Sequence, residues 1–209
     1  KLLQMKPNKY QKILDDVLTK VKTSKSKPTL LLHCCCAPCS SYVFEYLVPY
    51  FNITALFYNP NISPKTEYDF RLNELKRLIF DMNFSQKINL IEELYEPQKF
   101  KEISLGLENC PEGSLRCFKC YYLRLQKTAF IAKKLNFDYF TTTLTISPYK
   151  NANRLNEIGA MLASEYGTKY LFSDFKKKDG YKHSIELSKK YNLYRQNYCG
   201  CKFSKKASV

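Results

Sequence analysis

The chain has 209 residues, 44% of them hydrophobic, which is enough for one domain of ordinary size with a real core. Its 34 Lys and Arg against 19 Asp and Glu give a net charge of +15, which favours a polyanionic partner; a solvated basic surface is the alternative. Nine cysteines without a secretory leader argue against an extracellular disulfide framework, and no apolar run approaches the ~20 residues of a membrane span. We therefore expect a protein of the reducing cytoplasm.

Residues 1–28 are predicted to form a basic N-terminal helix and linker, and residues 29–209 a single α/β catalytic domain. The helix is indicated by apolar residues at helical spacing between Tyr10 and Val21, with lysines around them. Such a helix can pack on the core or lie against a phosphate backbone, and packing is the commoner outcome. The linker is Thr23–Pro28.

Beyond the linker, strand patterns alternate with helix patterns. Short apolar runs predict strands at Thr29–His33, Ile53–Tyr58, Ile88–Ile91, Tyr139–Leu144 and Lys169–Phe172. Apolar residues at helical spacing predict helices at Ser41–Val48, Lys65–Met82, Cys117–Leu135, Arg154–Tyr166 and Tyr181–Tyr191. This alternation predicts βαβ units and a parallel sheet. Ligands bind beyond the carboxyl ends of such strands, where we expect three segments to meet: His33–Cys39, Tyr58–Pro60 and Thr142–Pro148.

The first cysteine group follows the first predicted strand, at Cys34, Cys35, Cys36 and Cys39. Adjacent cysteines do not easily bond each other, so this group is expected to supply converging thiolates to a metal or an iron–sulfur cluster. Pro38 and Ser40 indicate a loop there. The alternative is that these cysteines are small buried hydrophobic residues.

Two further groups are the pair Cys117 and Cys120, which opens the long helix, and the pair Cys199 and Cys201 around Gly200. A Cys-x-x-Cys pair places two sulfurs on one helical turn, and the glycine lets the second pair turn both sulfurs toward one ion. Without Cys34 and Cys110, seven candidate ligands remain. Seven exceed the four that one zinc ion or one [4Fe–4S] cluster takes, so we expect a cluster with a second metal or a redox-active dithiol beside it.

Four motifs together resemble the epoxyqueuosine reductases of the QueH type: His33–Cys39, Arg116–Tyr121, Thr141–Pro148 and Tyr198–Cys201. The resemblance covers roughly Thr29 to Ser204. It implies a Rossmann-like three-layer α/β fold with a mainly parallel sheet, related to the PP-loop and nucleotide-hydrolase group. It also implies a cobalamin-independent iron–sulfur oxidoreductase that reduces epoxyqueuosine to queuosine at the wobble base of tRNA, the last step of queuosine biosynthesis.

By position, the resemblance assigns a [4Fe–4S] cluster to Cys35, Cys36, Cys117 and Cys120. It assigns an adjacent mononuclear iron, or zinc in its place in purified protein, to Cys39, Cys199 and Cys201, which would also be catalytic. The reaction consumes two electrons and two protons, so the expected partners are tRNA carrying epoxyqueuosine and an electron donor that the sequence does not identify.

The proton donor is less defined by the sequence. His33 lies beside the cysteines and is a candidate, although a histidine at a strand end is as often a packing residue; Tyr58 and Tyr121 are others. Lys150, Arg154 and Arg124 are candidate phosphate contacts, with ordinary surface charge as the alternative.

Two other functions are compatible with parts of the pattern. An iron–sulfur tRNA thiolase of the PP-loop type would need a glycine-rich phosphate loop after the first strand, and Cys34–Cys39 occupies that position. A non-catalytic zinc module that binds nucleic acid would explain clustered thiols and basic charge, but not an α/β core.

Overall fold

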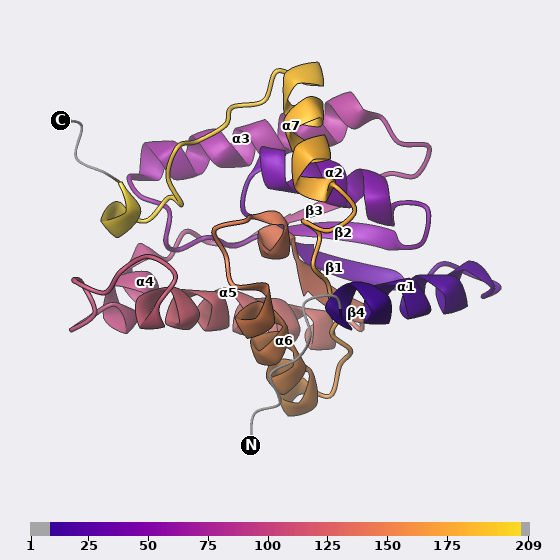
Figure 1. Cartoon of the computed structure of the whole chain (residues 1–209), viewed down its shortest axis with the longest axis horizontal. Helices are drawn as coiled ribbons and strands as arrows, with labels where there is room; N and C mark the ends of the chain where they lie inside the picture. The colour runs from indigo at the N-terminus through magenta and orange to yellow at the C-terminus, as the bar shows by residue number, and fades with distance from the viewer. Residues whose placement is uncertain (1–8, 206–209) are drawn as a thin grey trace.

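The computed structural model describes residues 9–205, in which a sheet of four parallel strands lies between two layers of helices (Figure 1). The strand order is β3-β2-β1-β4, and the strands are β1 (Thr29–His33), β2 (Asn52–Phe57), β3 (Asn89–Glu92) and β4 (Tyr139–Thr142). The helices are α1 (Lys9–Lys22), α2 (Ala37–Leu47), α3 (Lys65–Met82), α4 (Pro97–Ile103), α5 (Leu115–Lys134), α6 (Ala152–Tyr166) and α7 (Gly180–Lys190), with short 3-10 turns η1 (Thr143–Ile146) and η2 (Lys202–Ser204). The predicted Rossmann-like three-layer fold is confirmed.

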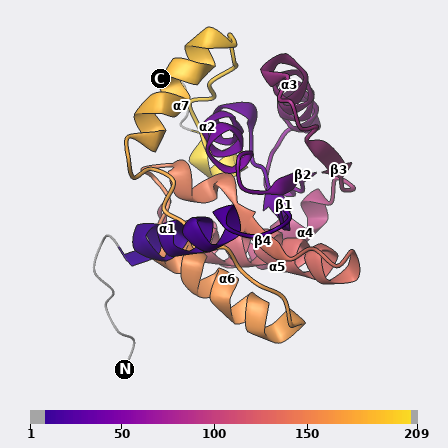
Figure 2. The same ribbon diagram turned by 90° about the vertical axis from the view of Figure 1, so that its right-hand side faces the viewer.

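Helices cover both faces of the sheet: α2, α3 and α7 lie on one side, and α5 and α6 on the other (Figure 2). The central strand β1 shows why both layers are needed, because its side chains alternate between the two faces. Leu30 and Leu32 are buried with Val43 of α2, whereas Leu31 is buried with Leu125 of α5. A continuous apolar run therefore encodes a strand that is covered on both sides.

Helix α1 packs on this core through Tyr10, Leu14 and Leu18, as its apolar stripe predicts. Asp15 on the same helix pairs with Lys178 at 2.7 Å. The first eight residues of the predicted appendage lie outside the described residues. The division into an appendage and a domain at residue 28 stays a prediction.

The start of α2 corrects the predicted loop around Pro38. The helix begins at Ala37, four residues before the predicted start, with Pro38 in its first turn. Proline is well tolerated there, because the N–H that it lacks would have no partner within the helix. Cys39 consequently lies on the first turn of a helix.

The predicted fifth strand is wrong. Of Lys169–Phe172, only one residue makes a sheet bridge, Tyr170 to Phe140. Just beyond it, the side-chain amide of Asn156 takes both backbone groups of Ser173, at 3.0 Å for the N–H and 2.8 Å for the carbonyl. Backbone groups bonded in this way cannot extend a ladder. Helix α4 is an element that the sequence patterns did not predict.

The carboxyl ends of β1, β2 and β4 meet at one edge of the sheet, as predicted. The chain leaves β1 for α2 on one face, and it leaves β4 through η1 for α6 on the other face. Loops that diverge from neighbouring strands in this way open a crevice at the topological switch point of the sheet. The first cysteine group lies in the β1 loop, so the fold places it at this crevice.

Gly159 is a packing constraint in the second helix layer. A Cβ atom at this position would lie 2.4 Å from the ring of Tyr170, which is itself buried. We expect Gly159→Ala to lower the free energy of unfolding by about 1–3 kcal/mol in urea denaturation, because the enclosed ring has to shift. Ser164→Ala on the exposed side of the same helix is the control. A gain of about 1 kcal/mol, as helix propensity alone predicts, would contradict this packing.

His183 joins α7 to α2. Its ring pairs with Glu186 at 3.0 Å and with Glu45 of α2 at 2.7 Å, and these two carboxylates raise the pKa of His183. The protonated ring therefore stabilises the fold below the unfolded pKa of about 6.5, and this contribution is lost as the pH rises through the folded pKa. In urea denaturation we expect His183→Gln to cost up to about 1 kcal/mol at about pH 5.5 and almost nothing at about pH 9, as for an exposed pair. Lys182→Gln should show no such pH dependence, and an equal cost at both pH values would refute the ion pair.

Candidate metal centre

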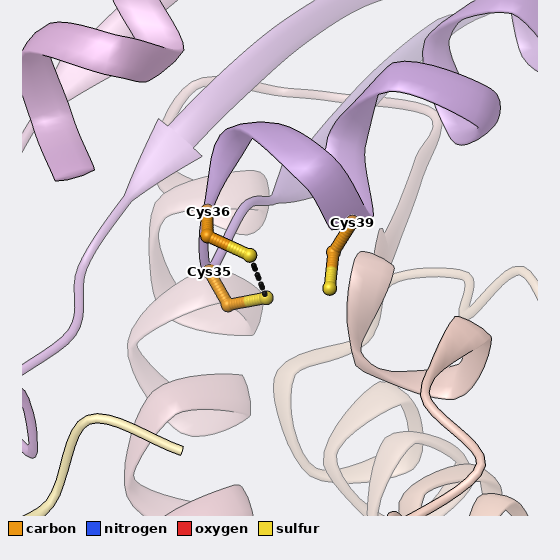
Figure 3. A group of neighbouring side chains, drawn as sticks. All are labelled: Cys35, Cys36 and Cys39. Carbon is orange, nitrogen blue, oxygen red and sulfur yellow. Dashed lines mark hydrogen bonds between the residues drawn. The ribbon is translucent and has the colours of Figure 1, made fainter. Parts of the chain in front are cut away.

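Three thiols converge at the turn between β1 and α2. The sulfur atoms of Cys35, Cys36 and Cys39 all lie within 4.8 Å of one another, and those of Cys35 and Cys36 are 3.6 Å apart (Figure 3). Sulfurs bound at about 2.3 Å to one tetrahedral ion lie about 3.8 Å from each other. All nine cysteines are free thiols. The spacing is therefore that of donors facing one centre.

The other two cysteine groups lie next to each other. Cys117 is on the first turn of α5, where its sulfur accepts a hydrogen bond from the N–H of Gly113 at 3.2 Å. One turn later, Cys120 is buried in a small apolar cluster that also contains Cys201. Cys120 interacts electrostatically with Cys199 as well as with Cys201. The fold thus brings together two pairs that are about 80 residues apart in the chain.

A cavity of about 560 Å³ connects the first and third cysteine groups, since Cys35, Cys39 and Cys199 all line it. This volume lies in the range of small-molecule sites. Its charged lining is mostly basic, with Glu112 as the one acidic residue and four cations: Arg71, Arg124, Lys150 and Arg195. The cavity is therefore a thiol-bearing pocket with a positive wall.

Arg71 of α3 holds the turn that carries Cys199. Its buried guanidinium pairs with Glu67 at 2.7 Å and donates to the carbonyls of Tyr198 at 3.4 Å and Cys199 at 3.2 Å. Gly200 has a φ of +112°, and a Cβ atom there would lie 3.0 Å from the Arg71 Nη1 atom. Glycine is required at this position both by the backbone conformation and by the close approach of Arg71.

Arg124 of α5 is a buried cation, with 2% of its surface exposed. Its guanidinium donates to Asn59 Oδ1 at 2.6 Å, to His33 Nε2 at 3.3 Å and to the Cys120 sulfur at 3.9 Å. No carboxylate in the described part of the chain pairs with it. A buried charge needs an opposite charge nearby, and here the thiolates are the groups that can supply it. The donor set therefore fits an anionic, thiolate-bound metal or iron–sulfur cluster.

Contacts among the thiols, helped by the positive wall, set the ionisation of each thiol. Hydrogen bonds from Cys36 and Cys39, together with the charges of Arg124 and Lys150, lower the pKa of Cys35 well below its usual value. Gln196 donates to the Cys36 sulfur at 3.0 Å. The contact with Cys35 raises the pKa of Cys36 to about 12, and the contacts with Cys35 and Cys36 raise the pKa of Cys39 well above its usual value. The site therefore favours one thiolate, on Cys35, and a thiolate is the form that binds metal.

Lys150 points into the cavity, where its Nζ atom lies 3.5 Å from the Cys199 sulfur. Burial lowers the pKa of Lys150, but the negative charges of Cys199 and Cys35 outweigh it and raise the pKa overall. The ammonium group is therefore held in its charged form beside the thiols.

Cys34 is separated from this chemistry. Its side chain is fully buried in the core, and its S–H donates to the carbonyl of Leu32 at 3.4 Å. Burial raises the pKa of Cys34 well above that of a free thiol. Cys34 is accordingly a neutral core residue, which matches its exclusion from the seven candidate ligands.

His33 is enclosed behind the cavity. Burial and the charge of Arg124 lower the pKa of His33 to about 3, so the ring is neutral. Its Nδ1 atom lies 2.8 Å from Thr142 Oγ1, and its Nε2 atom lies 3.3 Å from Arg124 Nε and 3.2 Å from the carbonyl oxygen of Tyr58. His33 is not among the cavity-lining residues, and its contacts hold Arg124 in place.

The sequence patterns identified the thiols but missed most of the residues that contact them and line the cavity. Arg71, Gln196 and Arg195 line the cavity without belonging to any local motif. Arg124 is buried rather than a surface charge, and Arg154 lies outside the cavity lining, over the ring of Phe118. The two tyrosines proposed as proton donors, Tyr58 and Tyr121, are also buried, and Tyr58 donates to Glu96 at 3.1 Å.

The family model and the curated relatives that match this chain all carry the same family name. Residues 30–207 match the family described as "Epoxyqueuosine reductase QueH". A relative of that name from Staphylococcus epidermidis is 43% identical over 209 residues, covering 97% of this chain and 88% of the relative. A relative of the same name from Streptococcus pyogenes serotype M1 is 40% identical, covering 98% of this chain and 82% of the relative. Another from Thermotoga maritima is 36% identical, covering 84% of this chain and 90% of the relative.

None of the helices in residues 9–205 combines the length and apolar character that a membrane crossing requires.

The charge of Arg124 can be tested with a metal probe. We expect Arg124→Met to weaken Zn²⁺ binding to the metal-free, reduced protein about 10–100-fold in chelator competition, because its positive charge favours the thiolates. Arg124→Lys keeps the charge and should retain most of the affinity. Arg154→Met is the matched control outside the cavity. Equal Zn²⁺ affinity in Arg124→Met and the unsubstituted protein would contradict this role.

Proposed function

Because the chain belongs to the QueH family of epoxyqueuosine reductases, we propose that it reduces epoxyqueuosine to queuosine at the wobble base of tRNA. The observation that carries the proposal is the basic cavity at the switch point of the sheet, which is lined by the first and third cysteine groups, with the second group packed beside the third. Removal of the epoxide oxygen as water consumes two electrons and two protons, so the reaction requires an external electron donor as a further partner.

For the cofactors, we propose a [4Fe–4S] cluster on Cys35, Cys36, Cys117 and Cys120, and a mononuclear iron on Cys39, Cys199 and Cys201. Two observations support two metals: seven thiols exceed one tetrahedral set, and Cys39 and Cys199 line the same cavity. When bound, the cluster supplies electrons one at a time, and the second metal supplies a Lewis acid beside it.

The residues around the thiols bind and orient. Arg124 and Lys150 hold positive charge against the thiolates, and Arg71 fixes the turn of Cys199. His33 fits a positioning role in this proposal, because its neutral ring keeps the guanidinium of Arg124 in place. The role of His33 as proton donor stays a prediction. In the cavity itself, the Lys150 ammonium donates to the Cys199 sulfur at 3.5 Å.

A tRNA substrate agrees with the charge of the chain. Besides the net +15, the cavity wall presents Arg71, Lys150 and Arg195, and Lys176–Lys178 lie close to α7. Lys202, Lys205 and Lys206 add basic charge near the third cysteine group, and Lys206 lies outside the described residues. An anticodon loop is single-stranded, so its wobble base can turn out of the stack and enter a cavity at modest cost.

The reducing cytoplasm is part of the proposal, because the nine free thiols require it. A PP-loop thiolase is less well supported, since the turn from β1 to α2 contains Cys34–Cys36 and no glycine to surround a phosphate. A zinc module without catalysis is distinguished by the experiment below.

The test combines iron and sulfide analysis with nucleoside analysis of tRNA, using anaerobically purified protein. We expect the unsubstituted protein to be brown, with about five iron and four sulfide per chain, and to convert epoxyqueuosine to queuosine with a reductant. Cys199→Ser should lose about one iron and keep about four sulfide, because it removes a ligand of the second metal only, and conversion should fall at least about 100-fold.

Cys110→Ser is the matched control, since Cys110 belongs to none of the three groups, and it should change neither analysis. A loss of sulfide in Cys199→Ser would show that Cys199 is a ligand of the iron–sulfur cluster and not of the second metal. A colourless zinc protein that does not convert the nucleoside, even after reconstitution with iron and sulfide, would overturn the reductase assignment.

A further inference from the structure

Tyr149 differs from the other exposed large hydrophobic side chains of the protein. Its side chain is 76% exposed, and of the large exposed hydrophobic residues in the described part, it is the one that lines the thiol cavity. Within residues 9–205 its ring takes part in no ring–ring or cation–π contact. An aromatic ring left bare at the mouth of a cavity is available to a ligand.

The turn between η1 and α6 fixes this position. The N–H of Tyr149 donates to Ser147 Oγ at 3.3 Å, and the N–H of Lys150 donates to the Ser147 carbonyl at 3.2 Å. Lys150 reaches inward to the Cys199 sulfur, whereas Tyr149, one residue earlier, remains exposed. The turn therefore presents a planar ring at the entrance and an ammonium group inside.

Arg195 is a cation that lines the same cavity. Its guanidinium donates to Ser188 Oγ at 3.0 Å and to the Ser184 carbonyl at 3.5 Å and lies 5.9 Å from the centre of the Tyr181 ring, and the residue remains exposed. An exposed aromatic ring together with cations is the combination by which proteins hold unpaired nucleotides: the base stacks on the ring, and the cation binds the phosphate. The cavity is of a size to take the substituent of such a base.

We infer that Tyr149 is the stacking residue for the unpaired nucleobase whose modified group enters the thiol cavity, with Arg195 at its phosphate. Tyr149 is thus a substrate-positioning residue, and stacking holds the nucleotide while the modified group reaches the thiols. The identity of the modified base rests on the proposed function, because an aromatic face does not distinguish one base from another.

The first test is binding, measured by fluorescence anisotropy without reductant. The probe is an RNA stem–loop that carries epoxyqueuosine at the wobble position. Tyr149→Ala should raise the Kd about tenfold or more, since one stacked base is lost, whereas Tyr149→Phe should stay within about twofold. Phe80→Ala is the matched control, because Phe80 on α3 is 83% exposed and does not line the cavity. A Kd unchanged by Tyr149→Ala would overturn the inference.

The second test is conversion of the same RNA with reductant. We expect Tyr149→Ala to raise KM about tenfold and to change kcat much less, and an unchanged KM would also overturn the inference. The two assays separate this inference from the proposed function. Tyr149-dependent binding without conversion by the unsubstituted protein supports the inference and refutes the reductase assignment. Conversion by the unsubstituted protein with no effect of Tyr149→Ala on Kd or KM supports the reductase assignment and refutes the inference about Tyr149.

Discussion

The structure depends on a buried positive charge that the protein matches with thiolates. Arg124 is enclosed between α5 and the loops that follow β1 and β2, and its two close neutral partners, Asn59 and His33, give hydrogen bonds but no charge. Burying an unpaired ion costs several kcal/mol. The nearby cysteines remove that cost only when they are ionised or bound to metal, so the cation and the thiol cluster stabilise each other.

The same electrostatics explain why consecutive cysteines behave differently. Cys34 faces the apolar core, where burial favours the neutral thiol. Cys35, the next residue, faces the cavity, where two thiol hydrogen bonds and the charges of Arg124 and Lys150 favour the thiolate. In an extended segment, neighbouring side chains point to opposite sides. One run of cysteines therefore contributes both a core residue and a ligand.

Local patterns predicted most of the fold. The strand β1 and the long helices α3 and α5 follow from apolar periodicity, which depends on residues close in the chain. The residues that hold the thiols in place do not follow from local periodicity. Arg71 contacts the carbonyl of Cys199, 128 residues away, and no local pattern indicates such a pair. The false fifth strand has the same origin, because its ladder is ended by Asn156, a residue on the neighbouring helix.

The position of the thiols also has a physical reason. In many nucleotide-binding proteins with a parallel sheet, the turn after the first strand binds phosphate, because the N-terminus of the following helix carries a partial positive charge. Here Cys36 is the N-cap of α2, and Cys39 lies on its first turn. The neighbouring Cys35 raises the pKa of Cys36 and of Cys39, whereas a helix N-terminus favours a thiolate for the same reason that it attracts a phosphate. Exchanging a glycine-rich loop for cysteines thus keeps the electrostatics of the turn and changes its ligand from an anion to a metal held by thiolates.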